Sequence, residues 1–449
     1  MKKQAAAAFL ALLLIALIPL GCAKKEKPEN PLFVDGLLWV ADSSLDKPYL
    51  LVNEKGEVVF QGGDITPTLI DPANGTAAVC AEKDGKWGIV DSSGKCIIPF
   101  EYTRTYPFSD NGLACVIDGR TYLYLNRKGE TVIRLGSGEA GGSYLENGLA
   151  FVYKDRWYGV IDSKGEAVLP CEYDDVRIYP NVGLIRAVKG DTQFFFDNNG
   201  KKVFELSDEV EVYGFYDDGY SVIMKDRGFG LIDSAGRTLV EPVYASLGSY
   251  EYRMLTGGLP KPTVKGTLFK NGRLAFQDAS TMEWGYFDEK GNKVIPAQYS
   301  LADAFASNGI ALVGLDGRCF IDKSGKVVIG DSFDLVRSFA DNGLAAFKKN
   351  GKWGYIDSRG NIAIPAQFGY AYKFAKNGLA AVCDTTTHKF GFIDKTGKYV
   401  ISPEFDLVYS SFFDDGYVIV KVGDKLGVID SKGNYIIEPK YPSIAGYLL

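Results

Sequence analysis

A segment of about 36 residues recurs along almost the whole of this 449-residue chain. Every copy has an acidic or amide residue three positions before a glycine, and these marker residues are Asn53, Asp91, Asn126, Asp162, Asp197, Asp233, Asp288, Asp322, Asp357, Asp394 and Asp430. Nine of the ten intervals between them measure 34 to 38 residues, and the interval from Asp233 to Asp288 measures 55. Units of this length typically bury their apolar surface only against their neighbours. We therefore predict one continuous array of about eleven units.

Each unit is predicted to contain three short β-strands. In the copy around Asp357, the apolar run Gly343–Phe347 lies between Asn-Gly and Lys-Asn-Gly, which is typical of a buried strand. Two further strands, Trp353–Asp357 and Asn361–Pro365, flank the sequence Asp-Ser-Arg-Gly. Asp can bond the main chain two residues on, and Gly at the fourth position accepts a positive φ. The second and third strands should therefore form a hairpin with a type I turn and a glycine bulge.

Seven copies share a glycine, a proline and an aromatic residue at fixed distances from the marker residue. The glycine lies three positions before it, at Gly88, Gly159, Gly230, Gly285, Gly354, Gly391 and Gly427. The proline follows by eight or nine positions, at Pro99, Pro170, Pro242, Pro296, Pro365, Pro403 and Pro439. The aromatic residue follows by eleven, at Tyr102, Tyr173, Tyr244, Tyr299, Phe368, Phe405 and Tyr441. The four copies that lack the glycine also lack the proline.

This covariation suggests that the glycine, the proline and the aromatic residues pack as one unit. An uninterrupted hairpin would place the tryptophan beside the glycine opposite the proline. The expected pairs are Trp87 with Pro99, Trp284 with Pro296 and Trp353 with Pro365. The glycine would leave room for the close approach of another backbone. The motif residues of these copies are Trp87, Gly88 and Asp91, then Trp284, Gly285 and Asp288, then Trp353, Gly354 and Asp357.

A further aromatic residue lies four positions before the glycine that opens most copies. These residues are Phe108, Tyr144, Tyr179, Phe215, Phe305, Phe339, Phe374 and Phe412. Side chains at a fixed repeat position usually fill equivalent sites in the core. We expect them to form a repeated core layer rather than a ligand site.

The run Lys-Trp-Gly-Tyr-Ile-Asp-Ser-Arg-Gly at residues 352–360, with Pro365 and a later Asn-Gly-Leu-Ala, resembles the WG (KWG) repeat of bacterial exported proteins. Close copies surround Asp91, Asp288, Asp357, Asp394 and Asp430, whereas those around Asn53, Asn126, Asp197 and Asp322 lack the glycine. The family is defined by its repeat rather than by an activity. The resemblance therefore implies an all-β repeat fold and transfers no catalytic residue.

Three-stranded units can assemble radially as a propeller or along an axis as an open superhelix or solenoid. Propeller blades usually have four strands, and the segment after each proline could supply the fourth. Eleven copies exceed an ordinary single ring. We therefore expect two rings or an open superhelix, and favour a propeller-like arrangement.

The amino terminus carries an export signal at residues 1–21. Lys2 and Lys3 precede an apolar stretch that is short for a membrane span and ends in Ile-Pro-Leu-Gly-Cys22. That ending resembles a bacterial lipoprotein box, which implies that Cys22 receives a lipid. Residues 22–32 are charged and proline-bearing, as expected of a flexible tether. We predict an exported lipoprotein anchored in the bacterial cell envelope.

The long interval between copies marks an insertion at residues 245–271, between copies one to six (33–244) and copies seven to eleven (272–449). Long insertions in repeat proteins often emerge on one face and carry binding, although a seam between sub-arrays would look the same. Exposed aromatic and arginine side chains favour interfaces. The candidate binding residues here are Tyr250, Tyr252, Arg253 and Met254.

The sequence contains little that suggests catalysis. His388 is the only histidine, and its Thr-Thr-Thr-His-Lys context predicts an exposed turn rather than a triad or zinc centre. The recurring aspartates are explained by turns, so no metal or cofactor is expected. The net charge of −6, with no basic cluster, disfavours nucleic-acid binding. The cysteines after Cys22 are expected to be reduced, and they are Cys80, Cys96, Cys115, Cys171, Cys319 and Cys383.

These observations favour a binding scaffold for a protein or glycan, because a repeat array presents an extended surface. One alternative is an envelope polysaccharide hydrolase or lyase that uses paired carboxylates in a groove. A structural spacer is the third possibility.

Overall fold

The computed structural model shows an all-β protein, and the residues that it describes contain 45 short strands in eleven antiparallel sheets. The residues described lie between 37 and 448, without 42–48, 62–69, 72–77, 84, 92–94, 249–265, 315–317, 331–332, 410–411, 414 and 445–446. Ten sheets have four strands and one has five. None of the described segments forms a helix long and apolar enough to cross a membrane.

Each four-stranded sheet is built from consecutive strands. The first strands are β4 (Ile70–Asp71), β8 (Arg104–Phe108), β12 (Glu139–Gly141), β16 (Asp175–Tyr179), β20 (Glu211–Phe215), β24 (Ser246–Leu247), β28 (Leu301–Ala302), β32 (Leu335–Val336), β36 (Tyr370–Ala371) and β40 (Leu407–Val408). The second strands are β5 (Ala78–Lys83), β9 (Ala114–Asp118), β13 (Ala150–Lys154), β17 (Leu184–Lys189), β21 (Tyr220–Lys225), β25 (Leu274–Gln277), β29 (Ile310–Gly314), β33 (Ala345–Lys349), β37 (Ala380–Cys383) and β41 (Val418–Val422).

The third strands are β6 (Lys86–Asp91), β10 (Thr121–Leu125), β14 (Trp157–Ile161), β18 (Thr192–Asp197), β22 (Gly228–Asp233), β26 (Trp284–Phe287), β30 (Arg318–Asp322), β34 (Lys352–Ile356), β38 (Phe390–Ile393) and β42 (Lys425–Ile429). The fourth strands are β7 (Cys96–Tyr102), β11 (Thr131–Arg134), β15 (Ala167–Tyr173), β19 (Lys202–Ser207), β23 (Thr238–Tyr244), β27 (Lys293–Tyr299), β31 (Val327–Ile329), β35 (Ile362–Phe368), β39 (Tyr399–Phe405) and β43 (Tyr435–Tyr441).

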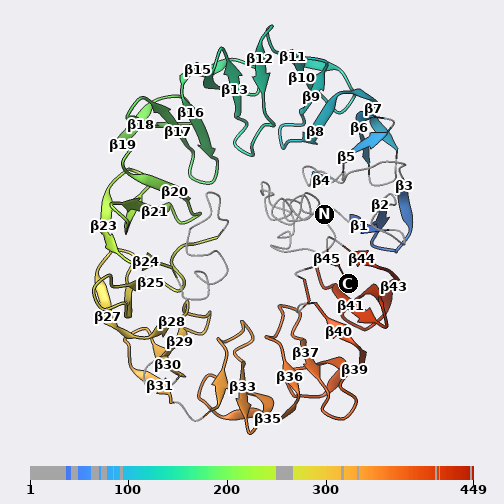
Figure 1. The fold of residues 1–449 in the computed structure, drawn as a ribbon, viewed down its shortest axis with the longest axis vertical. Coiled ribbons are helices and arrows are strands. Elements are labelled where there is room, and N and C mark those ends of the chain that lie inside the picture. Colours follow the sequence, from blue (N-terminus) through green and yellow to red (C-terminus); the bar gives the residue numbers. More distant parts are fainter. Residues whose placement is uncertain are drawn as a thin grey trace, which may run out of the picture.

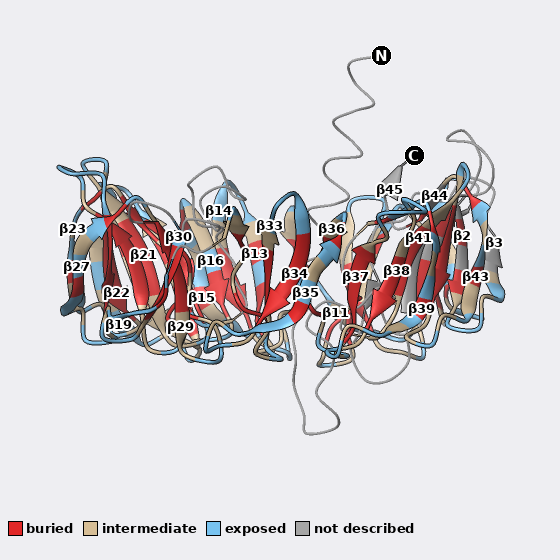
Figure 2. Cartoon of the chain, turned by 90° about the horizontal axis from the view of Figure 1, so that it is seen from below, coloured by how far each residue is buried: buried red, intermediate tan, exposed pale blue. Residues whose placement is uncertain are grey.

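The sheets are arranged radially around one axis, with the first strand of each sheet toward the centre and the fourth at the outer rim (Figure 1). The propeller-like prediction is confirmed, but the unit has four strands rather than three. The added strand begins shortly after the aromatic residue that lies eleven positions after the marker residue, and it becomes the first strand of the next sheet. For example, β36 follows Phe368. Seen from the side, buried strands lie between exposed turns on both faces of the ring (Figure 2).

The five-stranded sheet joins the two ends of the described chain and closes the ring. It contains β1 (Leu37–Ala41), β2 (Tyr49–Asn53), β3 (Val58–Gln61), β44 (Ser443–Ile444) and β45 (Tyr447–Leu448), in the order β3-β2-β1-β44-β45. Val40 pairs with Ile444, and both side chains are fully buried. The expectation of two rings or an open superhelix is therefore wrong, because the last segment of the chain supplies the inner strand of the first sheet.

The core is divided into clusters that form between neighbouring sheets. One cluster joins Trp353 and Tyr355 of β34 to Ala371 and Val382 of the next sheet. All eight members of the predicted aromatic layer are at most 6 % exposed. At least six of the eight rings contact an aromatic residue of the preceding sheet, as Phe374 contacts Tyr355 at a centroid distance of 4.8 Å. The core-layer prediction is confirmed.

The predicted turn is present in the hairpin of β34 and β35. Asp357 Oδ1 accepts hydrogen bonds from the main-chain N–H groups of Arg359 (2.9 Å) and Asn361 (2.8 Å), and Gly360 has a φ of 82°. The side-chain hydrogen bond from Asn361 is the largest cause that holds the pKa of the Asp357 carboxyl below its usual value. Asn53 bonds its own turn in the same way, which explains why an amide can replace the acid.

The predicted pairing of tryptophan with proline is wrong. Trp353 pairs with Phe368, and the ladder then shifts so that Tyr355 pairs with Ile364. Trp353 is buried, whereas Pro365 is exposed. The same pairing places Trp87 opposite Tyr102 and Trp284 opposite Tyr299.

The position requires glycine because the bulge brings main-chain atoms of the fourth strand too close for a Cβ atom. A Cβ atom on Gly354 would lie 2.5 Å from the main-chain oxygen of Ile364, and the equivalent distance in the seven glycine copies is 2.5–2.8 Å. The predicted close approach of a backbone is thus confirmed, and the backbone belongs to the fourth strand of the same sheet. In the copy of Asp197 the ladder continues without a second shift, from Phe195–Phe204 to Thr192–Ser207. Glycine and proline therefore covary because both belong to one bulge.

Candidate functional site

The binding residues predicted in the insertion lie outside the described part of the chain, and so does the lipidation residue. These residues are Tyr250, Tyr252, Arg253, Met254 and Cys22. Both ends of the predicted insertion belong to the ring, because Ser246–Leu247 forms β24 and residues 266–271 lead back to β25.

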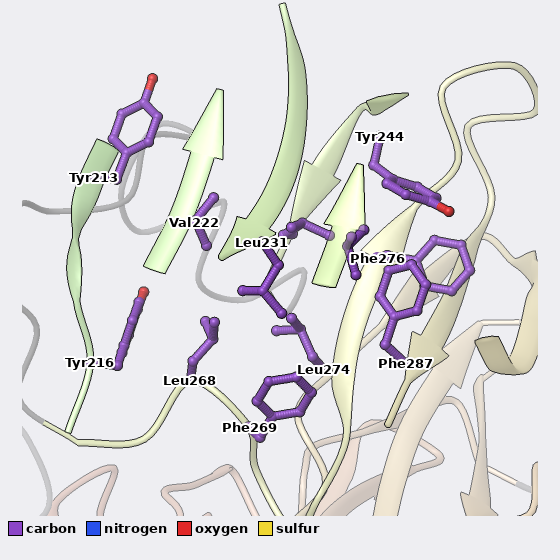
Figure 3. Packing of buried hydrophobic residues seen from close by; sticks show 12 residues of the cluster. Tyr213, Tyr216, Val222, Leu231, Tyr244, Leu268, Phe269, Leu274, Phe276 and Phe287 are labelled. Carbon is purple, nitrogen blue, oxygen red and sulfur yellow. The ribbon is translucent and has the colours of Figure 1, made fainter. Parts of the chain in front are cut away.

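The returning end of the insertion is fixed to the preceding sheet. Gly266 N–H donates to Asp217 Oδ2 (2.7 Å), and Phe269 N–H donates to Asp218 Oδ2 (3.0 Å). Leu268 and Phe269 are buried in the cluster between the sheets of β20–β23 and β24–β27 (Figure 3). Leu268 and Phe269 are therefore part of the core, which the sequence did not indicate.

A group of polar and aromatic side chains, half-buried except for the buried Trp353, lies where the sheets β32–β35 and β36–β39 meet. We call Arg337, Trp353, Tyr370, Tyr372 and Phe390 the arginine–aromatic cluster. The Arg337 guanidinium carbon lies 4.6 Å from the ring centroid of Trp353 and 4.8 Å from that of Tyr370. Arg337 Nη2 also donates a hydrogen bond of 2.8 Å to the Tyr370 hydroxyl. The cation is thus held between two rings of adjacent sheets.

Further contacts are made within the sheet β36–β39 and with the main chain of the next sheet. The rings of Tyr370 and Tyr372 have centroids 5.0 Å apart, and both contact Phe390 of β38. The Tyr372 hydroxyl donates a hydrogen bond of 3.1 Å to the carbonyl of Val408 in β40. Burial is the main reason that the pKa of Tyr372 is raised, and the Arg337 charge opposes this shift. The phenol therefore stays protonated at neutral pH and remains a hydrogen-bond donor.

Three members of the arginine–aromatic cluster, Arg337, Tyr370 and Tyr372, occupy positions at which the repeats disagree. Tyr372 and Arg337 both lie fifteen residues after their marker residues, where the copy around Asp288 has Asp303. The residue between Tyr370 and Tyr372, Ala371, is fully buried and faces the core. Because successive side chains of a strand point to opposite faces, one face carries core residues that the copies share and the other carries residues that differ between copies. The only signal of these residues in the sequence is that disagreement between copies, because the shared motif does not include their positions.

The sheet β16–β19 shows a second departure from the repeat. Gln193 stands four residues before Asp197, the position that Trp353 occupies in its own copy, and it is 1 % exposed. Gln193 Oε1 accepts a hydrogen bond from Arg186 Nε (2.6 Å), and Arg186 Nη1 donates to Asp175 Oδ2 (2.9 Å). This network satisfies the polar groups that replace the usual apolar core.

The described residues contain no arrangement typical of a metal site. No group of three histidine, cysteine or carboxylate side chains in this part of the chain is placed to hold a metal ion. His388 lies exposed in a turn with a φ of 55°, and its N–H donates to the carbonyl of Asp384, as its sequence context predicted. The thiol of Cys115 is buried, which raises its pKa to about 12. Such a thiol is protonated and inert at neutral pH.

Radial four-stranded sheets, closed by strands from both ends of the described chain, define a β-propeller. The family model described as "WG containing repeat" matches residues 87–122, 158–192, 284–319, 320–353, 353–384, 390–425 and 427–447. These segments cover just over half of the chain, and the protein therefore belongs to the WG-repeat family. A search of the curated proteins finds no match.

Solved structures share only a distant likeness with the chain. A crystal structure of the eukaryotic initiation factor is 10 % identical over 81 % of this chain and 95 % of its own, with a TM-score of 0.33. Hsv2 of Kluyveromyces lactis is 11 % identical over 49 % of this chain and 74 % of its own (TM-score 0.28). The dihydro-heme d1 dehydrogenase NirN is 15 % identical over 97 % of this chain and 83 % of its own (TM-score 0.28). At these scores the likeness carries no argument about function.

Proposed function

We propose that this WG-repeat propeller is a scaffold that binds a protein partner through the arginine–aromatic cluster. The observation that carries the proposal is the placement of Arg337, Tyr370 and Tyr372 at or directly after first strands, on their variable face. The three side chains are half-buried, and their hydrogen bonds join two sheets and reach a main-chain carbonyl of a third. Arginine, tyrosine and tryptophan are the residue types that dominate binding energy at protein interfaces. Their mutual contacts hold the rings in fixed positions, which lowers the entropic cost of binding.

The proposal includes no catalytic step. Each described carboxyl group whose pKa departs from its usual value is shifted downward, as hydrogen bonds do for Asp357 and the Lys154 contact does for Glu139. A glycosidase acid needs a carboxyl with a raised pKa that faces a second carboxylate. The hydrolase or lyase alternative is therefore favoured by no observation in the described residues.

Replacing Tyr370 and Tyr372 with alanine is expected to weaken capture of the partner about tenfold or more, because the ring faces and the anchor of Arg337 are lost. The full chain would be immobilised and exposed to native envelope extract, and captured material would be measured with and without protease treatment. Tyr153→Ala is the matched control, since Tyr153 is also half-buried and packs on one tyrosine, at 4.9 Å, but lies on a second strand. Equal capture by all three proteins would contradict the proposal, and capture that survives protease would indicate a glycan.

We further propose that the scaffold is held at the bacterial envelope by a lipid on Cys22. The support is the apolar signal that ends in Leu-Gly-Cys, followed by the charged segment 23–31. Cys22→Ser is expected to move the mature protein from the membrane fraction to the soluble fraction. A variant that stays in the membrane fraction with unchanged gel mobility would refute the anchor.

A further inference from the structure

The outer rim consists of the ten fourth strands and β3, and in the described part of the chain their outward edges carry no partner strand. Such edges invite pairing with another chain unless proline, bulges or short length prevent it. Seven of them carry the glycine-linked bulge and its proline, exemplified by Pro365 in β35. Proline lacks an N–H and the bulge bends the strand, so these seven edges are protected. The outer-rim proline thus has a second role beyond the hairpin.

Among the described fourth strands, β19 is the exposed edge best suited to pairing. The strands without the proline are β3 with four residues, β11 with four, β31 with three and β19 with six. The ladder between β18 and β19 runs without a break from Phe204 to Ser207. Lys202, Val203, Glu205 and Ser207 are exposed along it.

The charges at the two ends of β19 favour a second copy of the same strand as its partner. Lys201 and Lys202 lie at the beginning, Asp208 and Glu209 follow its end, and all four are exposed. An antiparallel copy of the same strand would place the basic end of each beside the acidic end of the other. Within one copy, Lys202 pairs with Glu205 at 2.9 Å and Glu209 pairs with Lys225 at 3.2 Å. Both pairs are exposed and therefore weak, so Lys202 and Glu209 can exchange partners when two copies meet.

We propose that β19 is a homodimerisation edge at which two copies of this chain pair antiparallel and join their four-stranded sheets across a two-fold axis. The contact is isologous, so it closes on itself and does not propagate into fibres. It is also narrow, because the neighbouring fourth strands are protected or short. The dimer is therefore weak and forms only as the protein concentration rises.

Two charge variants test this pairing by sedimentation velocity of the full chain. Lys201→Glu with Lys202→Glu makes both ends of β19 acidic, and Asp208→Lys with Glu209→Lys makes both ends basic. Each variant alone is expected to dimerise about tenfold more weakly than the wild type or worse. An equimolar mixture of the two is expected to regain the dimer, because opposite charges then meet at both ends. The control, Lys395→Glu with Lys398→Glu beside the Pro403-bearing β39, should dimerise as the wild type does.

A wild type that stays monomeric at every concentration would overturn the proposal. So would variants that dimerise as well as the wild type, because the contact would then lie elsewhere. Circular dichroism of each variant shows whether the ring is intact, and a dimer regained on mixing could not come from variants that had lost their fold.

Discussion

Replacing Ile444 with aspartate is expected to lower the free energy of unfolding by about 4 kcal/mol or more. Ile444 is fully buried and pairs with Val40, and the cluster around it includes Leu38, Val428 and Tyr441. The substitution removes this apolar contact and leaves a charge without a partner at the junction of the first and last sheets. Urea unfolding, followed by tyrosine and tryptophan fluorescence, measures the loss.

The matched control is Val400→Asp. Val400 is also β-branched and lies in a strand, β39, but it is 47 % exposed at the outer rim. Its replacement should change the free energy of unfolding by about 0.5 kcal/mol or less. If both variants lost the same stability, the buried contact between the chain ends would not exist.

Replacing Gly354 with alanine is expected to cost about 1–3 kcal/mol of stability, although alanine is small. The new methyl group would lie 2.5 Å from the oxygen of Ile364 and 2.8 Å from the nitrogen of Ala366, and both are main-chain atoms that cannot move without shifting the bulge. The free energy of unfolding from urea titration is again the measurement.

Gly330→Ala is the control for this change. Gly330 lies eight residues after Asp322, where other copies have the proline, and apart from its chain neighbours no heavy atom of the described residues would come within 4 Å of its new Cβ. Its replacement should be neutral to within about 0.5 kcal/mol. Stability of Gly354→Ala equal to that of Gly330→Ala would show that the bulge does not press on the glycine.

Local features were predictable because a few residues determine them. The turn at Asp357 needs only a side-chain acceptor and a glycine with positive φ, and both are visible in the sequence. The aromatic layer follows from one fixed position per repeat, as Phe374 illustrates. The predicted register of Trp353 was wrong because it assumed an uninterrupted ladder. The joint presence of glycine and proline in the same copies instead indicates a bulge.

Features that depend on how units combine could not be derived in the same way. The first strand of a sheet can be as short as Tyr370–Ala371, too short for any periodicity to be seen. Closure depends on the small rotation between neighbouring units, accumulated over the whole array, which no single residue specifies. Arg337, Tyr370 and Tyr372 lie at variable positions, and a search for shared residues passes over them.

The distance between residues 57 and 438 tests the closed ring most directly. Glu57 lies between β2 and β3 of the first sheet, and Glu438 lies in β43 of the last four-stranded sheet. Asn361 and Gly330 occupy the same repeat positions as Glu57 and Glu438, respectively, in two sheets that are consecutive along the chain. Spin labels introduced through a non-natural amino acid at 57 and 438, and in a second protein at 330 and 361, would be compared by pulsed electron resonance. A closed ring predicts the same single short distance for both pairs. A long or broad distribution for 57 and 438, beside a short one for 330 and 361, would mean that the array is open.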